Sequence, residues 1–215
     1  MSWVRARKPE HKEQRRRAIL EAAAELFREQ GLDATSLNAI AARAGISKAN
    51  VYRYFESREE IFLHLLLGDY EEWVSALEET LAPLAGSGKL DAVARALTES
   101  YLARPRLPSL VAALSSVLER NVTLEVVVAF KTRFMALAVR LTNALHAALP
   151  SLDMDRTRRF LMYSHFIVAG MWPSAHPPEA VRQALERPEL QALRVEIERD
   201  LRGAIETLLR GLLPA

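Results

Sequence analysis

The chain has 215 residues, a formal net charge of +2 and no cysteine, and half of its residues are hydrophobic. This composition is typical of a globular protein with a core of its own, and the lack of cysteine excludes disulfides, thiolate metal ligands and a cysteine nucleophile. No apolar run approaches the roughly 20 residues of a membrane span, and no apolar segment follows the N-terminal charges, so we expect neither a membrane helix nor a secretory signal.

Basic residues gather at the N-terminus. Residues 1–17 hold seven Lys or Arg against two Glu, whereas residues 61–215 are nearly balanced, with 17 basic and 18 acidic residues. A basic end on a neutral body indicates a polyanionic partner at that end. The alternative is a solvated end without a partner. We predict a basic arm over residues 1–11.

Two helices are predicted in the first part of the chain. Apolar residues between positions 11 and 30 recur at helical spacing, and Gly31 follows as a helix terminator. A second, short helix is expected to begin after Thr35 or Ser36, since either hydroxyl can cap it.

A third short helix follows a glycine-containing turn. Gly45 permits a tight turn, and Ser47 can cap the helix after it. Ser57 and Glu60 then have the spacing of a capping box, which starts a fourth helix. Two short helices joined in this way indicate a helix-turn-helix, with any small helical bundle as the alternative.

The third helix, residues 48–55, carries an unusual set of side chains. Val51 and Phe55 share the face that points inward. Ala49 and Arg53 lie opposite, and a small residue there lets the helix axis approach a surface closely. The flanking side chains, those of Lys48, Asn50 and Tyr52, are of the types that contact bases and phosphates in a major groove.

Beyond residue 58 the predicted helices are longer. The fourth helix is expected to end near residue 82. Five more are expected over residues 90–103, 108–120, 123–149 with Thr123 as cap, 153–171 with Asp153 as cap, and 188–213. Glycine- and proline-rich stretches separate them. The second region is therefore expected to be an all-helical domain of five or more helices.

Residues 12–62, which include "SLNAIAARAGISKANVYRYFESREEIF", closely resemble the DNA-binding domain of the TetR family of bacterial transcriptional regulators. The resemblance implies an all-α protein: an N-terminal three-helix helix-turn-helix domain followed by a larger helical domain for ligand binding and dimerisation. The implied boundaries are residues 12–72, with the helix-turn-helix at about 36–55, and residues 73–215. It also implies a cytoplasmic protein.

The family's DNA contacts carry over by position. They fall at the start of the second helix, along the third helix and at the start of the fourth, on Ser36, Asn38, Lys48, Ala49, Asn50, Tyr52, Arg53, Tyr54 and Arg58. Arg58 matches a phosphate-contacting position. Asn50 replaces the threonine that is usual in the family, which leaves the preferred bases open. The basic arm would add phosphate or minor-groove contacts.

The resemblance further implies a homodimer that pairs the last two long helices of each copy and binds a palindromic operator in double-stranded DNA. An apolar stripe at helical spacing marks the last helix, at Leu190, Leu193, Ile197, Leu201, Ile205, Leu208 and Leu212. The alternative is that this stripe belongs to the core of one chain.

A small-molecule effector would lie among the helices of the second domain. The candidate lining residues are Tyr101, Phe130, Phe134, Met135, Tyr163, His165, Phe166 and Trp172. Aromatic residues at helical spacing also fill ordinary cores, which is the alternative for each. Few cations lie among them, so an apolar or weakly polar effector is expected. We expect no cofactor and no metal.

The predicted function is a ligand-responsive repressor that a small molecule releases from its operator. A TetR-like activator, or a regulator without a small-molecule ligand, is the alternative. A nonspecific DNA-binding protein is a further rival, since it would need the phosphate contacts alone. An enzyme is not expected, because the five histidines lack metal-ligand spacing and no nucleophile or phosphate-loop motif is present.

Overall fold

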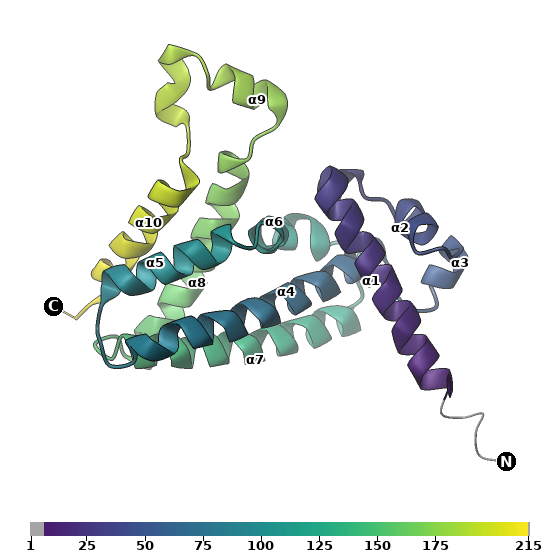
Figure 1. Cartoon of the computed structure of the whole chain (residues 1–215), viewed down its shortest axis with the longest axis horizontal. Coiled ribbons are helices and arrows are strands. Elements are labelled where there is room, and N and C mark those ends of the chain that lie inside the picture. The colour runs from purple at the N-terminus through teal and green to yellow at the C-terminus, as the bar shows by residue number, and fades with distance from the viewer. Residues whose placement is uncertain (1–6, 215) are drawn as a thin grey trace. The chain divides into compact units, whose positions relative to one another are not determined.

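The structure, a computed structural model, describes residues 7–214, and every regular element among them is helical (Figure 1). The chain forms two compact units. Among these residues, unit 1 comprises residues 7–68 and 114–130, and unit 2 comprises residues 69–113 and 131–214. The first six residues of the predicted basic arm lie outside the described residues, and its remainder begins the first helix. None of the helices within residues 7–214 has the length and apolar character needed to cross a bilayer.

Unit 1 is built around the first helices of the chain. Its elements are α1 (Arg7–Ala34), α2 (Leu37–Arg43), α3 (Lys48–Val51), the first part of α4 (Arg58–Leu81), a π-helical turn (Leu114–Leu118) and the start of α7 (Leu124–Ala148). Ile19, Ile40, Val51 and Phe62 are completely buried at its centre. The inward positions of α1, α2 and α3 predicted from the apolar spacing are therefore confirmed.

Gly31 interrupts α1 near its end. Its φ of 78° lies in the left-handed region that glycine adopts readily. The three residues beyond it return to helical geometry, so α1 runs to Ala34. The buried Thr35 follows, and its hydroxyl donates to the carbonyl of Gly31 over 2.7 Å. This contact fixes the direction in which the chain leaves α1 for α2.

Unit 2 is a larger helical assembly. After the rest of α4 it contains a 3-10 turn (Ala82–Leu84), α5 (Leu90–Leu102), α6 (Arg106–Ala113), the rest of α7, α8 (Met154–Ala175), α9 (Glu179–Ala184), a second 3-10 turn (Pro188–Leu193) and α10 (Ile197–Leu212). Its largest fully buried side chains include Trp73, Tyr70, Tyr101 and Phe160. Helix α8 packs against α6 and α10, and α10 also packs against α5.

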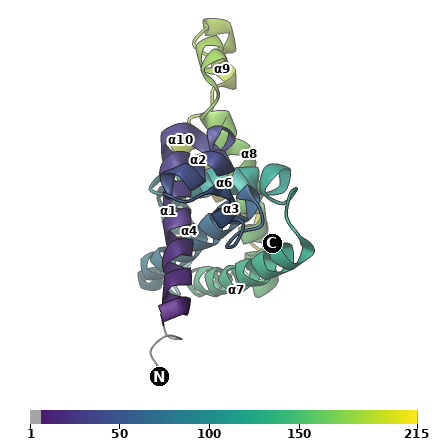
Figure 2. The ribbon, with the colours of Figure 1, turned by 90° about the vertical axis from the view of Figure 1, so that its right-hand side faces the viewer.

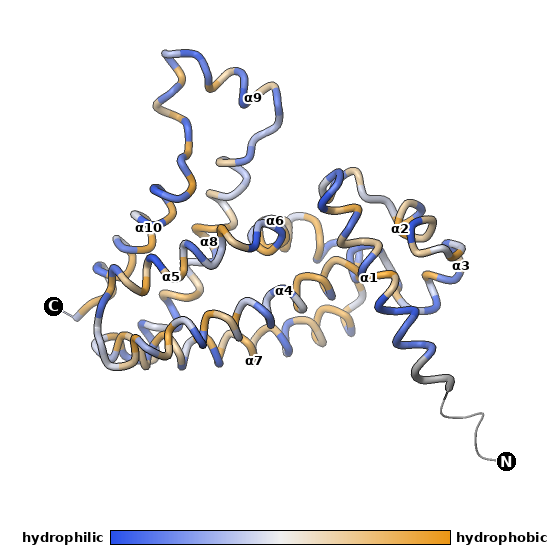
Figure 3. The backbone as a smooth tube through the Cα atoms, in the orientation of Figure 1, coloured by the Kyte–Doolittle hydropathy of each residue, from blue (hydrophilic) through white to orange (hydrophobic). Residues whose placement is uncertain are grey.

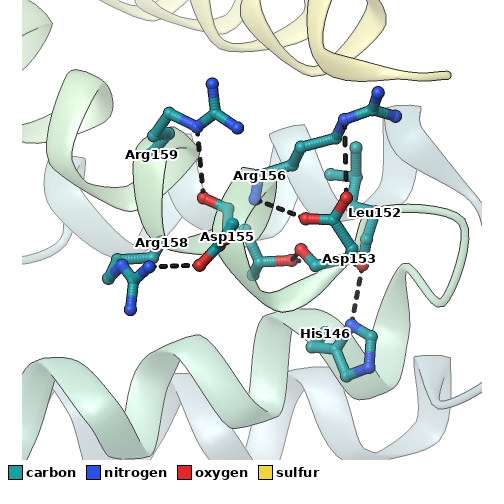
Figure 4. Close-up of polar contacts among 8 residues, drawn as sticks. His146, Leu152, Asp153, Asp155, Arg156, Arg158 and Arg159 are labelled. Atoms are coloured by element: carbon teal, nitrogen blue, oxygen red, sulfur yellow. Dashed lines mark hydrogen bonds and ion pairs between the residues drawn. The ribbon is translucent and has the colours of Figure 1, made fainter.

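The turn between α7 and α8 is held by side chains (Figure 4). The Asp153 carboxylate accepts from the N–H of Arg156 over 2.8 Å, so the predicted cap of α8 is confirmed. His146 Nδ1 lies 2.7 Å from the carbonyl oxygen of Leu152, to which it donates. Arg158 pairs with Asp155 on the first turn of α8. His146 therefore has a structural partner at this turn.

The prediction of one long helix over residues 188–213 is wrong for residues 188–196. Residues 188–193 form a 3-10 turn, and α10 begins only at Ile197. None of residues 176–199 is buried, and the segment with α9 extends beyond the adjoining ends of α8 and α10 (Figures 1 and 2). Its residues are largely hydrophilic (Figure 3). Residues 188–196 therefore lack the packed apolar face from which most helical stability in proteins comes.

Two other helices have bounds that differ from the predicted ones. The helix predicted over 108–120 begins earlier, at Arg106, and changes to π-helical geometry at Leu114. Helix α8 continues past Pro173 to Ala175 instead of ending at residue 171. In this last turn the hydroxyl of Ser174 donates to the carbonyl oxygen of Gly170 over 3.1 Å. Helix ends depend on such tertiary and side-chain contacts more than on local spacing.

Candidate nucleic-acid interface

Serine caps position α2 and α3 in unit 1. Ser36 Oγ accepts from the N–H of Ala39 over 3.1 Å, and Ser47 Oγ accepts from the N–H of Asn50 over 3.3 Å. Between the two helices Gly45 has a φ of 66°, which permits the turn. Ser36, not Thr35, is therefore the N-cap of α2, and the predicted cap at Ser47 is confirmed.

Helix α3 is shorter than predicted. Its α-helical part ends at Val51, and residues 52–54 continue as tight turns in which the N–H of Tyr54 donates to the carbonyl of Val51 over 2.9 Å. The N–H of Phe55 donates to the same carbonyl over 3.1 Å. Val51 and Phe55 are both buried, as their spacing predicted. The chain thus keeps the same inward face although the regular helix stops early.

The outward side of α3 presents polar side chains to solvent. Lys48, Asn50, Tyr52 and Arg53 are exposed, and none of these side chains forms a hydrogen bond or ion pair with another described residue. The Tyr52 ring is 52% exposed. Ala49, also exposed, adds no bulk among them. This combination of two cations, an amide and a phenol can donate to phosphates and base edges.

The remaining predicted contact residues are placed differently from one another. Ser36 and Asn38 are exposed at the start of α2, and Tyr54 is half-buried. Arg58 is half-buried, and its guanidinium donates to the carbonyl oxygen of Thr35 over 3.2 Å and to Glu59 over 3.1 Å. In this arrangement Arg58 ties the start of α4 to the connection between α1 and α2, where the resemblance implied a phosphate contact.

Arg16 of α1 holds the end of the α3 segment, a role that the sequence did not indicate. Its guanidinium lies over the Phe55 ring, and Nη1 donates to the carbonyl oxygen of Tyr54 over 3.1 Å. Nη2 lies 2.5 Å from His64 Nε2, which accepts because arginine can only donate. Arg16, one of the seven basic residues of the N-terminal region, is therefore already engaged in contacts within unit 1.

A chain of polar contacts supports the start of α4. Ser57 Oγ accepts from the N–H of Glu60 over 3.1 Å, but the Glu60 carboxylate accepts from the N–H of Glu56, at 2.5 Å, rather than from Ser57. The predicted capping box is therefore half formed. Burial raises the pKa of Glu60, but the neighbouring His64, whose Nε2 lies 3.7 Å from Oε1, and the hydrogen bond from the N–H of Glu56 outweigh burial and hold that pKa below its ordinary value.

The candidate effector residues do not form one site. Tyr101, Phe134 and His165 lie together in unit 2, where they join Tyr70 and Trp73, which sequence reasoning missed. The others are spread over several environments: Phe130 is buried in unit 1, Trp172 is buried in unit 2, and Met135, Tyr163 and Phe166 are exposed.

Trp172 has the contacts of a core residue. Its indole N–H donates to Ser109 Oγ over 2.9 Å, and its ring stacks on His176 with centroids 4.3 Å apart. Its polar atom is therefore satisfied within the chain. Among the described residues, no group of three His, Asp or Glu side chains is placed to hold a metal ion.

Comparison with known proteins gives two family matches. Residues 67–215 match the family described as "Tetracyclin repressor-like, C-terminal domain". Residues 19–65 match the one described as "Bacterial regulatory proteins, tetR family". The second match contains α2, α3 and the start of α4.

Similar individual proteins include RutR, an HTH-type transcriptional regulator of Escherichia coli, with 38% identity over 74 residues, 33% of this chain and 35% of RutR. The HTH-type transcriptional repressor KstR2 of Mycobacterium tuberculosis is 44% identical over 62 residues, 29% of this chain and 30% of KstR2. The chain thus spans about a third of the length of these relatives. A TetR-family regulator from Streptomyces coelicolor has the same fold, with a TM-score of 0.59 and 24% identity over 93% of this chain and 99% of its own.

Proposed function

The chain belongs to the TetR family of bacterial regulatory proteins, and from this membership we propose that it is a sequence-specific DNA-binding regulator of transcription. The observation that carries the proposal is the outward side of α3, where Lys48, Asn50, Tyr52 and Arg53 are exposed and unpaired among the described residues. These exposed donors, held on a short helix capped by Ser47, suit the phosphates and base edges of a major groove.

In the proposed complex α3 enters the major groove. Asn50 and Arg53 offer hydrogen bonds to base edges, and Arg pairs with guanine in a bidentate manner. Lys48 and Tyr52 would fix the register through phosphates. Ser36 and Asn38, exposed at the start of α2, would contact the adjacent phosphates of the DNA backbone. Arg58 would act by holding the start of α4 in place, since its guanidinium is engaged with Thr35 and Glu59.

We propose that two copies pair through α8 and α10 and bind a palindromic operator. The buried side of α10 cannot form that contact, because Leu201 and Ile205 of the predicted stripe, and Leu209 outside it, pack inside their own chain. The supporting feature is instead the outer side of these helices, where small residues allow close approach. Gly170 of α8 and Gly203 and Thr207 of α10 are exposed.

We further propose repression, the activity of the similar repressor KstR2, with release by a small molecule that binds in unit 2. Such a ligand would shift the population toward a form of the dimer that binds the operator less well. An activator, or a regulator without a ligand, uses the same interface with DNA. Transcription from the target promoter, with and without the purified protein, separates these alternatives.

The test of DNA recognition is footprinting on the DNA upstream of the gene and its neighbours, followed by affinity measurements against a scrambled duplex of equal length. A specific regulator is expected to prefer its site by about 10³ or more at fixed salt. Equal affinity for both duplexes, with steep salt dependence, would identify a nonspecific DNA-binding protein and refute the proposal.

A further inference from the structure

Three buried polar atoms in unit 2 have no hydrogen-bond partner among the described residues. They are the hydroxyl oxygens of Tyr70 on α4 and Tyr101 on α5, and Nε2 of His165 on α8. Nearly all buried polar side chains in proteins are paired, because an unpaired one has lost its contacts with water and gained nothing. Phenylalanine at either tyrosine position would avoid that loss.

The three groups belong to one cluster of rings. The Tyr70 ring centroid lies 5.5 Å from that of His165 and 5.2 Å from that of Trp73, which is 4.7 Å from that of Tyr101. Trp73 is itself satisfied, since its indole N–H donates to Ser100 Oγ over 2.8 Å. Three unsatisfied groups from three helices therefore belong to one cluster of neighbouring rings in the core.

The hydrogen-bonding capacity of the cluster is defined. His165 Nδ1 lies 2.7 Å from the carbonyl oxygen of Leu161, so Nδ1 carries the proton and Nε2 presents a lone pair. Burial lowers the pKa of His165, which keeps the imidazole neutral. Burial also raises the pKa values of Tyr70 and Tyr101, so both hydroxyls keep their protons. The cluster offers one acceptor and two hydroxyls, and no charge.

Phe134 of α7 forms the outer side of the cluster. Its ring centroid lies 4.4 Å from that of Tyr70 and 5.9 Å from that of His165. Unlike Tyr70 and Tyr101, Phe134 is only half-buried. Phe134 therefore gives the cluster a ring that reaches solvent.

We propose that Tyr70, Tyr101 and His165 recognise an uncharged ring compound that carries a hydroxyl group. Its O–H donates to His165 Nε2, and its oxygen accepts from the tyrosine hydroxyls. The ring packs against Trp73 and Phe134. This inference rests on the proposed function, because it names the chemical class of the effector in unit 2. A carboxylate is disfavoured, since it cannot donate to Nε2.

The test compares phenol, toluene and benzoate binding to the full-length protein by titration calorimetry. Phenol is expected to bind at least about tenfold more tightly than toluene and benzoate, since it alone can pair with all three groups. Tyr70→Phe and Tyr101→Phe should each remove most of the preference for phenol over toluene. Tyr163→Phe is the matched control, because it deletes an exposed hydroxyl on α8 and should leave the preference intact.

Stability distinguishes recognition from a purely structural role. Without ligand, Tyr70→Phe and Tyr101→Phe should unfold at the same temperature as the wild type or at a higher one, because each removes an unpaired buried group. Nitrogen-15 NMR of His165 should show a bare Nε2 whose resonance moves when phenol is added and stays in place with toluene.

Three results would each overturn the inference: no phenol binding at millimolar concentration, equal binding of phenol and toluene, or a lower unfolding temperature in both phenylalanine variants. None of these measurements involves DNA. Failure to find a preferred operator would therefore refute the proposed regulator, whereas failure of phenol recognition would refute only the effector class.

Discussion

The guanidinium carbon of Arg16 lies 4.5 Å from the centroid of the Phe55 ring. The same side chain donates to the carbonyl of Tyr54, so one residue of α1 makes both a cation–π contact and a hydrogen bond with the end of the α3 segment. The contacts of Arg16 with Tyr54 and Phe55 therefore hold the α3 segment against α1, while the outward side chains of α3 face solvent.

Replacement of Arg16 tests this support. Arg16→Ala should lower the free energy of unfolding by about 1–2 kcal/mol, because the cation–π contact and the hydrogen bond to Tyr54 are both lost. Chemical denaturation measures the change. Arg17→Ala is the matched control, since Arg17 is exposed one position later on α1, and its stability should equal that of the wild type. An equal loss in both variants would show that the Arg16 contacts contribute nothing specific.

The outward side of α3 gives a second prediction. Lys48→Ala and Tyr52→Ala should weaken operator binding by about tenfold or more each, while dimerisation and helical content stay unchanged, because both side chains are exposed and unpaired. Lys48→Ala should also reduce the dependence of binding on salt by about one counterion. Arg182→Ala, an exposed arginine change on α9, serves as control. Normal operator binding by either α3 variant would mean that α3 is not the helix that contacts the operator in the major groove.

Glu60 provides a pH-dependent prediction. Its pKa in the folded protein lies below the ordinary value of 4.5, so its contribution to stability is complete above pH 4.5 and is lost as the pH falls through the folded pKa. Glu60→Gln should be less stable than the wild type at neutral pH, and the difference should shrink below pH 4.5. Urea denaturation over a pH series measures it. A stability difference that does not change with pH would contradict this role of the Glu60 carboxylate. Glu21→Gln, at an exposed position, is the control and should be as stable as the wild type at every pH.

The last helix allows a test of which apolar residues form the core. Ile205→Ala should cost about 2–4 kcal/mol of unfolding free energy, because Ile205 is fully buried where α10 packs on α5 and α8. Leu193→Ala should change stability by less than about 0.5 kcal/mol, because Leu193 is 69% exposed. Thermal or chemical unfolding compares the two. Similar losses would mean that Leu193 is covered in solution.

Local patterns predicted well where the deciding interactions are local. The cap at Ser47 and the inward positions of Val51 and Phe55 follow from hydrogen bonds and spacing within a few residues. The role of Arg16 could not be predicted this way, because its partners lie 38 or more positions away along the chain. Local charge indicated only that it was basic.

Unit 2 shows the same limit. Tyr70 and Trp73 lie on the apolar side of α4, where the sequence pattern does not distinguish them from ordinary core residues. Only the packing of α4, α5 and α8 reveals that Tyr70, Tyr101 and His165 leave unpaired atoms in one place. Conversely, Leu190 and Leu193 continue the spacing of α10, yet the residues before Ile197 pack on nothing that would hold them in a helix.

The segment between α8 and α10 has a practical consequence. Residues 176–199 contribute no buried side chain, so the chain can open there at little energetic cost, and a protease can bind it in extended form. Cleavage within the segment would leave Leu201, Ile205 and Leu209 in place between α5 and α8. A single cut by limited proteolysis should therefore yield two fragments that stay associated and elute together.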